Sequence, residues 1–207
     1  MEELIAYFST YIPLRQVEKQ AITALFVKRT LKRRQFVLRS DELCQHYTFV
    51  AAGCLKMYYT DANGSDHNLQ FAADNDRPED RWIADIGSLH TLKKSQLTIQ
   101  ALEASAILQI EKPNLIYLYH HFPKFDRIFR VITENKLVEF QNRILQTISS
   151  TAQERYQTFL DQYPNLARRL SNTQIASYLG VTPEFLSRLR RRALEDERSV
   201  SPGKPIS

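Results

Sequence analysis

Residues 171–192 read SNTQIASYLGVTPEFLSRLRRR, and their spacing predicts two short helices joined by a tight turn. The residues that would face one core between two crossing helices are apolar or small: Ile175, Ala176, Leu179, Val181, Leu186 and Leu189. Gly180 lies where the chain must leave the first helix, and glycine adopts a positive φ without penalty. This stretch therefore predicts a helix-turn-helix.

Both helices of the predicted motif have recognisable starts. Ser171 and Gln174 form an S-x-x-Q pattern, which is a candidate capping box. Thr182 can cap the second helix, and Pro183 follows at its first position, where the missing N–H costs nothing. The two boundaries agree with the apolar spacing.

The exposed face of the second helix is predicted to carry Pro183, Glu184, Ser187, Arg188 and Arg191. Their spacing places them on one side of the helix, and apart from the proline they are polar or charged. Such a face can meet base edges and phosphates in the DNA major groove. The alternative is an ordinary αα-hairpin, whose late arginines are solvated and lie near the negative end of the helix dipole.

The composition is that of a globular protein with a modest basic excess. The chain has 207 residues, 43% of them hydrophobic, and a net charge of +5, which fits a polyanionic partner without demanding one. Its two cysteines, Cys44 and Cys54, are too few for a disulfide scaffold or for the four ligands of an iron–sulfur cluster. No signal peptide or membrane span is recognisable, so the expected location is the cytoplasm.

The first half of the chain predicts helices followed by short strands. Apolar stripes predict one or two helices within residues 1–27. Aromatic and β-branched residues then predict strands at 35–39, 47–52, 55–60, 68–73, 97–102 and 106–110. Gly53 and the Asn63-Gly64 pair mark turns, whereas residues 74–85 read as an irregular charged segment. Several strands at short intervals indicate an antiparallel sandwich or barrel.

Residues 122–150 predict one long helix. Its apolar positions step by three and four: Phe122, Phe125, Phe129, Ile132, Leu137, Phe140, Ile144 and Ile148. This stripe can pack on the sheet, pair with a second copy of itself, or do both. We expect a homodimer, because helix-turn-helix proteins usually bind two half-sites; the alternative is a helix that only caps the barrel. Another helix is predicted at 151–163, and residues 198–207 are expected to be disordered.

Two stretches resemble the Crp/Fnr family of bacterial transcription regulators. ERYQTFLDQYPNLARRLSNTQIASYLGVTPEFLSRLRR resembles the family's E-R-hydrophobic-x-x-F/L-L run followed by I-A-x-Y-L-G-x-T/S-x-E-x-x-S-R, and FVAAGCLKMYYTDANGSDHNLQF resembles strands of its β-roll. The resemblance implies an α+β fold: an N-terminal antiparallel, jelly-roll-like β-roll with flanking helices, a long dimerisation helix and a C-terminal helix-turn-helix. The implied domains are a cyclic-nucleotide-binding-like sensor at 1–121, a dimerisation helix at 122–150 and a DNA-binding domain at 151–207.

The same resemblance implies which residues read DNA. Glu184 matches the family glutamate that accepts from cytosine, Ser187 a serine of the Fnr branch, and Arg188 the arginine that reaches guanine. Pro183 stands where the cyclic-AMP branch has an arginine, so one base contact of that branch is absent. The residues expected to contact phosphates are Arg168, Arg169, Thr182, Arg190 and Arg191.

The resemblance also points to a candidate effector pocket, at Gly87, Ser88, Leu89, Lys94 and Ser95. The family's ribose-binding glutamate is missing there, and lysine replaces an arginine that pairs with phosphate. His46, His67 and His90 are isolated, which is typical of surface or hydrogen-bonded histidines rather than haem ligands. We therefore expect no cyclic AMP, iron–sulfur cluster, haem or metal, and the effector stays unknown.

The sequence as a whole predicts a homodimeric transcription regulator and not an enzyme. Its expected partners are double-stranded DNA and a second copy of the chain, with RNA polymerase added for an activator. One alternative is a small-molecule-binding module whose helical domain mediates protein contacts. Another is an enzyme on the β-barrel, as in cupins, although His67 has no H-x-H partner for a metal.

Overall fold

The computed structural model describes residues 1–74 and 77–200 of the 207-residue chain. The chain divides into two compact units, Met1–Ile144 and a second unit that begins at Leu145. Among the described helices, none combines the length and the apolar character that crossing a membrane would require.

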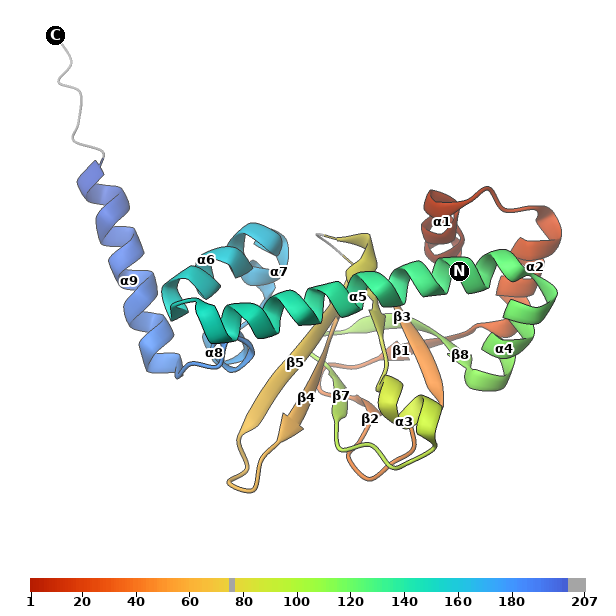
Figure 1. Cartoon of the computed structure of the whole chain (residues 1–207), viewed down its shortest axis with the longest axis horizontal. Helices are drawn as coiled ribbons and strands as arrows, with labels where there is room; N and C mark the ends of the chain where they lie inside the picture. The colour runs from red at the N-terminus through yellow and green to blue at the C-terminus, as the bar shows by residue number, and fades with distance from the viewer. Residues whose placement is uncertain (75–76, 201–207) are drawn as a thin grey trace, which may run out of the picture. The chain divides into compact units, whose positions relative to one another are not determined.

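The first unit contains the helices and strands that the sequence predicts, with several additions (Figure 1). Its first helices are α1 (Glu2–Tyr11) and α2 (Gln16–Leu25). Its strands are β1 (Val27–Leu31), β2 (Phe36–Leu38), β3 (His46–Ala52), β4 (Cys54–Thr60), β5 (Asp66–Ala73), β6 (Trp82–Ile83), β7 (Thr98–Ala101) and β8 (Ser105–Glu111). Further helical segments are η1 (Pro78–Arg81), α3 (Ile86–Thr91), α4 (Lys112–His121) and α5 (Pro123–Ser149).

The strands form two four-stranded antiparallel sheets, ordered β1-β8-β3-β6 and β2-β7-β4-β5. Strands far apart in the sequence are neighbours, since β1 pairs with β8 from Val27↔Gln109 to Leu31↔Ser105. This arrangement confirms the predicted antiparallel β-roll. The sequence prediction lacks β1, because this edge strand is mostly exposed and gives no alternating apolar pattern.

Gly53 and Gly64 stand at the two turns that the sequence marks. Gly53 joins β3 to β4 with φ of +97°, and a Cβ there would lie 2.3 Å from Ser105 Oγ and 2.8 Å from the Ala104 carbonyl oxygen. Gly64 has φ of +80° in the β4–β5 turn, with open space around it. Only the first turn therefore requires glycine for both its dihedral angle and its close packing.

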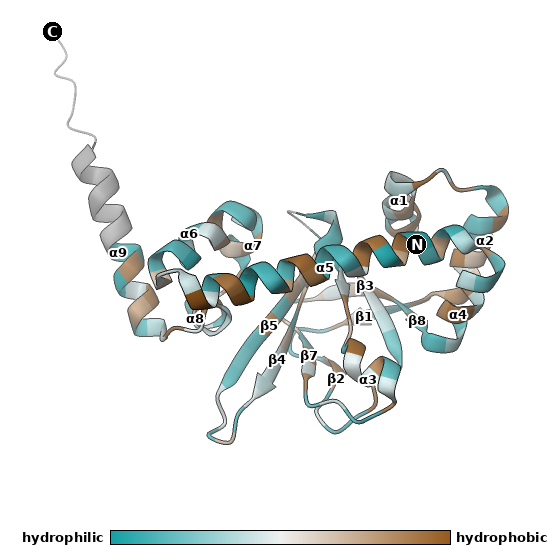
Figure 2. Ribbon diagram, in the orientation of Figure 1, coloured by the Kyte–Doolittle hydropathy of each residue, from teal (hydrophilic) through white to brown (hydrophobic). Residues whose placement is uncertain are grey.

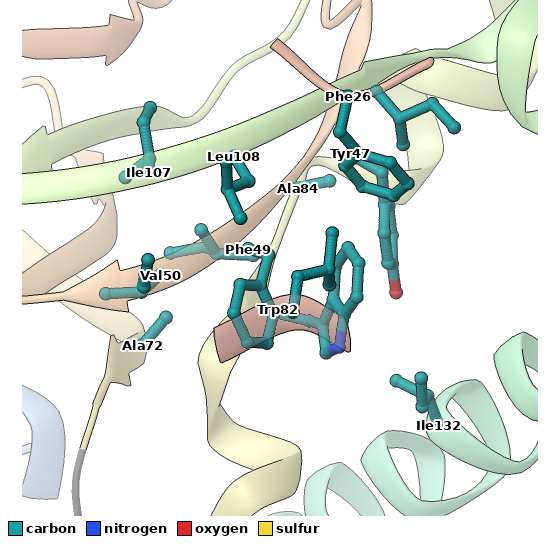
Figure 3. Packing of buried hydrophobic residues seen from close by; sticks show 14 of the residues in the cluster. Phe26, Tyr47, Phe49, Val50, Ala72, Trp82, Ala84, Ile107, Leu108 and Ile132 are labelled. Carbon is teal, nitrogen blue, oxygen red and sulfur yellow. The ribbon is translucent and has the colours of Figure 1, made fainter. Parts of the chain in front are cut away.

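Trp82 occupies the centre of an aromatic cluster and is 1% exposed. Its ring centroid lies 5.0 Å from that of Phe49, 5.1 Å from that of Tyr47 and 5.1 Å from that of Phe129 of α5. Figure 3 shows the indole between Phe49 and Tyr47, with its nitrogen on the side where Ile132 lies. The cluster joins the outer face of one sheet to the helices that cover it.

The expectation of an irregular segment at residues 74–85 was wrong for residues 78–83. Residues 78–81 form η1, and β6 pairs Thr48↔Ile83 and Phe49↔Trp82. A two-residue strand has no periodicity of its own, and the charged residues before it conceal its apolar pair. Tertiary packing, rather than local pattern, fixes this strand.

Helix α5 presents two apolar faces. Phe125, Ile128, Phe129 and Ile132 are buried in the first unit. Other apolar side chains of the helix are exposed: Leu137, Val138, Ile144, Leu145 and Ile148. Figure 2 shows hydrophobic and hydrophilic residues alternating along its length. The predicted long helix is confirmed, and its later half carries an apolar face without a described partner.

The second unit is helical after the end of α5. Its helices are α6 (Ala152–Gln162), α7 (Pro164–Arg169), α8 (Asn172–Leu179) and α9 (Pro183–Val200). The expected disorder from Arg198 was wrong for residues 198–200, which continue α9, and residues 201–207 lie outside the described part of the chain.

We predict that Gly53→Ala destabilises the protein by about 2 kcal/mol or more, because the methyl group adds a steric collision to an unfavourable backbone angle. Gly64→Ala is the matched control, with a positive φ but open space, and should cost about 1 kcal/mol. Urea unfolding of both variants measures the difference. Equal losses would show that crowding at Gly53 contributes nothing.

A buried ion-pair network joins η1 to α5. Lys136 Nζ lies 2.5 Å from Asp80 Oδ1 and 2.8 Å from Glu139 Oε2, while Arg77 Nε lies 3.5 Å from Asp80 Oδ2. Burial raises the pKa of the Asp80 carboxyl to about 6; Lys136 and Arg77 oppose this shift, and the neighbouring Glu139 carboxylate adds to it. The carboxyl is therefore ionised at neutral pH but accepts a proton under mild acid.

This raised pKa gives Asp80 a defined pH signature. Between pH 7 and pH 5 the folded state takes up a proton at Asp80 that the unfolded state does not, so this group adds about 1 kcal/mol to the free energy of unfolding on acidification. Asp80→Asn lacks the titration, and the wild type should gain stability relative to this variant as the pH falls. Denaturant titrations at both pH values test this, and a constant difference would contradict it.

Candidate nucleic-acid interface

The first helix of the predicted motif begins at a complete capping box. Gln174 N donates to Ser171 Oγ at 3.3 Å, and Ser171 N donates to Gln174 Oε1 at 2.8 Å. These reciprocal bonds satisfy backbone donors at the start of α8. The predicted capping box is confirmed.

The turn between α8 and α9 also has its predicted geometry. Gly180 ends α8 in the left-handed conformation with φ of +68°, and its N–H donates to the Ala176 carbonyl. Phe185 N donates to Thr182 Oγ1 at 3.2 Å, so the threonine caps α9 directly before Pro183. The turn redirects the chain within three residues and fixes where α9 starts.

The two helices share a compact core with α6. Ile175, Ala176 and Leu186 are fully buried where α8 and α9 meet. Arg155 of α6 donates through Nε to the Leu179 carbonyl oxygen at 3.3 Å, at the C-terminal end of α8. The guanidinium thus supplies a donor and a positive charge to the carbonyl end of this helix.

The predicted base-reading residues lie together on the exposed surface of α9. Glu184, Ser187 and Arg188 are all exposed, as is Arg191 one turn after Ser187. Ser187 Oγ donates to the Pro183 carbonyl oxygen at 2.9 Å, so its hydroxyl is turned back along the helix. The described contacts leave the Glu184 carboxylate and the Arg188 guanidinium without an ion-pair partner.

Phe185 is a surface residue that the sequence prediction missed. Its side chain is 37% exposed, and the Arg188 guanidinium carbon lies 5.7 Å from its ring centroid. The i, i+3 spacing of these two residues in a helix is the signal that could have found the pair. An aromatic ring beside an arginine restricts where the guanidinium can point.

The five predicted phosphate contacts occupy different environments. Arg168, Thr182 and Arg191 are exposed, whereas Arg169 and Arg190 are half-buried. Arg190 Nη1 donates to Asn172 Oδ1, which ties α9 to the first residue of α8. This arginine has a structural contact that its place in the Arg190-Arg191-Arg192 run does not reveal.

The residues of the predicted effector pocket surround the short helix α3. Ser88 Oγ donates to the Lys93 carbonyl oxygen at 2.6 Å, and Ser95 Oγ donates to Asp85 Oδ2, also at 2.6 Å. Asp85 caps α3 by accepting from Ser88 N at 3.1 Å. The two buried hydroxyls are thus engaged within the chain, and the Asp85 carboxylate already accepts from the backbone N–H and the hydroxyl that a phosphate here would need. These residues do not fit the phosphate of a cyclic nucleotide.

The other three residues of the predicted pocket differ in their exposure to solvent. Leu89 is buried, and Gly87 and Lys94 are exposed. A cavity of about 330 Å³ lies beside them, lined mainly by apolar side chains of the roll and of α5, including Met57, Leu69 and Leu137. None of the five predicted pocket residues lines it.

The histidines and acids of the described residues include no cluster of three that could hold a metal ion. His67 Nε2 lies 2.9 Å from Asp61 Oδ2 in the β4–β5 turn, and His46 Nε2 lies 3.8 Å from Glu111 Oε1. These are pairs of one histidine with one carboxylate, on different strands of the roll.

Comparison with known proteins gives matches along most of the chain, although no family model matches it. The transcriptional activator protein Anr of Pseudomonas protegens is 23% identical over 192 residues, which cover 86% of this chain and 75% of Anr. FixK2 from Bradyrhizobium japonicum matches in structure with a TM-score of 0.71 and 17% identity, over 87% of this chain and 89% of its own.

A further solved structure carries the family in its description. A protein from Eubacterium rectale, described as a regulator of the Crp/Fnr family, has a TM-score of 0.68 and 15% identity, over 92% of this chain and 88% of its own. The chain is thus similar in sequence to Anr along most of its length, and it shares its fold with these two structures.

Proposed function

We propose that this chain is a DNA-binding transcription regulator that acts as a homodimer and reads the major groove with α9. The observation that carries the proposal is the exposed face of α9, where Glu184, Arg188 and Arg191 stand on a helix fixed by a capped turn and a buried core. The similarity to the activator Anr supports it independently.

The chemistry of this face suits direct base reading. An arginine fork pairs with guanine O6 and N7, and a glutamate accepts from cytosine N4. Phe185 would hold the Arg188 guanidinium toward the groove and offer an apolar contact to a thymine methyl group. Ser187 would contact DNA by releasing its bond to the Pro183 carbonyl.

The remaining basic residues would supply affinity that does not depend on sequence. Arg168, Arg169 and Arg191 would contact phosphates and add a salt-dependent attraction, and the neutral Thr182 would add one further phosphate contact. We assign Arg190 a double role, in which it braces α8 against α9 through Asn172 and contributes positive charge near the backbone.

The exposed apolar face of α5 is the proposed dimer seam. Leu137 and Ile144 are seven residues apart, as are Val138 and Leu145, and Ile148 continues the first row at 80% exposure. A seven-residue repeat of apolar side chains favours pairing with a second helix of the same kind. We therefore propose that residues 122–150 form a dimerisation helix between a sensor domain, 1–121, and a DNA-binding domain, 151–207.

The proposed regulator would respond to a signal at its roll and, as an activator, contact RNA polymerase. Anr is described as a transcriptional activator, which supports this direction of control. Nothing in the proposed mechanism requires a catalytic step, because α9 acts by binding alone.

We predict that Arg188→Ala and Arg191→Ala weaken DNA binding in different ways. With sequences selected from a random DNA pool, Arg188→Ala should lose about 1–3 kcal/mol on the preferred site and relax selectivity at one base pair. Arg191→Ala should weaken binding to all sequences alike and reduce the slope of log K against log salt by about 1. Equal, sequence-independent losses for both variants, or no selected sequence at all, would contradict base reading by Arg188.

The dimer seam predicts a change of molecular mass. Ile144→Glu places a charge in the proposed interface and should convert a dimer at micromolar concentration into a monomer, as measured by light scattering. Val17→Glu is the control, because Val17 is an equally apolar, exposed residue on α2. A wild type of single-chain mass, or dissociation by both variants, would count against the seam.

A further inference from the structure

A second cavity lies between the two sheets of the roll, on the side of the edge strands β1 and β2. Its volume is about 420 Å³, and its walls come from β1, β2, β3, β7 and β8 together with residues 42–45. It shares no lining residue with the cavity beside α5. The size falls within the range of small-molecule sites.

One wall of this cavity is a row of hydrogen-bonded polar side chains. Arg29 Nη1 donates to Gln109 Oε1 at 2.7 Å, and Gln109 Nε2 donates to Thr48 Oγ1 at 3.0 Å. Gln109 and Thr48 are 3% and 1% exposed. The next cross-strand pair on the same face is Val50↔Ile107, so the interior turns apolar directly beyond the row. Burying polar side chains at such positions costs free energy unless they form hydrogen bonds, whereas apolar side chains would fill the same space without that cost.

The row leaves hydrogen-bond donors at the cavity: a buried hydroxyl on Thr48 and the exposed guanidinium of Arg29. Thr48 Oγ1 accepts from Gln109, and its hydroxyl hydrogen has no acceptor among the described residues. Arg29 forms no ion pair within the described part of the chain, and only its Nη1 is used by Gln109. A guanidinium and a hydroxyl that share one cavity wall call for a ligand that accepts hydrogen bonds and carries negative charge.

The charges around Arg29 limit how much negative charge the cavity can accept. Burial lowers the pKa of the His46 imidazole; the Glu111 carboxylate opposes this shift and Arg29 adds to it, so the histidine contributes little positive charge at neutral pH. Glu42 lines the rim, where its Oε2 accepts from Arg39 N at 2.8 Å. One fixed positive charge beside one carboxylate favours a monoanion over a dianion such as phosphate.

The opposite wall is apolar and is formed by Val37, Leu38, Leu43 and Ile99. We propose that this cavity binds a small monocarboxylate with an apolar body. Its carboxylate pairs with the free N–H groups of Arg29 and the Thr48 hydroxyl, and its body packs against Leu38 and Ile99. A planar carboxylate matches the arginine fork, and the apolar wall gains from burying carbon atoms. The site is independent of DNA binding by α9.

The same cavity wall is bonded to α3. Cys44 N donates to Ser88 Oγ at 3.0 Å, and Ser95 N donates to the Glu42 carbonyl oxygen at 2.8 Å. Asp85 and Ile86, at the start of α3, line the other cavity beside α5. A ligand that fixes residues 42–45 therefore acts on a segment that reaches the helix of the proposed dimer.

Benzoate and its neutral counterpart benzamide test the site in the full chain. Methyl-labelled protein is titrated with each compound, and the shifts of Val37, Leu38, Leu43 and Ile99 are followed by NMR. Benzoate should shift these methyl groups, and benzamide should bind at least about tenfold more weakly, because it lacks the charge that Arg29 pairs. Shifts centred on Leu69 and Leu137, or equal affinities of the two compounds, would overturn the proposal.

Matched variants test whether benzoate affinity depends on the polar row of Arg29, Gln109 and Thr48. Arg29→Gln and Thr48→Val should each reduce benzoate affinity, the first by about tenfold or more, while the melting temperature confirms that each variant is folded. Lys28→Gln removes the same charge from the neighbouring position of β1, whose side chain points to the other face, and should leave affinity unchanged. Equal losses for Arg29→Gln and Lys28→Gln would show a general charge effect and would overturn the site.

Discussion

Burial of the Trp82 indole is the interaction on which the first unit depends. The strand that carries it has two residues and is held from several directions: Gln70 Nε2 donates to the Trp82 carbonyl at 2.8 Å, and Arg81 donates to the Val50 and Ala51 carbonyls at 2.9 and 2.6 Å. A large aromatic ring at the centre of a cluster contributes several times what one of these bonds does. Without it, helices α1 and α5 would lose the surface on which they pack.

Helix α5 follows from this packing and gives the fold its second constraint. Phe129 lies against Trp82, and about two turns later Lys136 is bonded to Asp80, which lies two residues before the strand. Arg143 continues the attachment by donating to the Asn68 and Leu69 carbonyls of β5. One face of the helix is thus fixed to the roll by apolar and then by charged contacts. Because these contacts take one side only, the seven-residue repeat on the other side stays available for a second helix.

The parts of the structure that the sequence predicts are those fixed by neighbours in the chain. The capped start of α8, Gly180 and Thr182 all act within four residues, so the spacing alone identifies the helix-turn-helix. Strand β6 and the Arg190–Asn172 bond cannot be predicted in this way, because their partners are distant in the sequence. Trp82 pairs with Phe49, 33 residues earlier, and Arg190 bonds to Asn172, 18 residues earlier. The cavity between the sheets is harder still, because five strands contribute to it and β1 has no apolar pattern.

The environment of α3 bears on which ligands the roll can accept. In a site built for phosphate, the backbone N–H groups and hydroxyls at such a turn point at the anion. Here Asp85 takes the bonds of Ser88 N and Ser95 Oγ, and Lys94 is exposed rather than directed inward. A phosphate would have to displace a carboxylate and meet its charge at close range, which is strongly unfavourable in a partly buried place. The roll and the long helix are thus present, and the start of α3 is closed by an internal cap. The Arg29–Gln109–Thr48 row lies elsewhere in the roll, where it lines a cavity of its own.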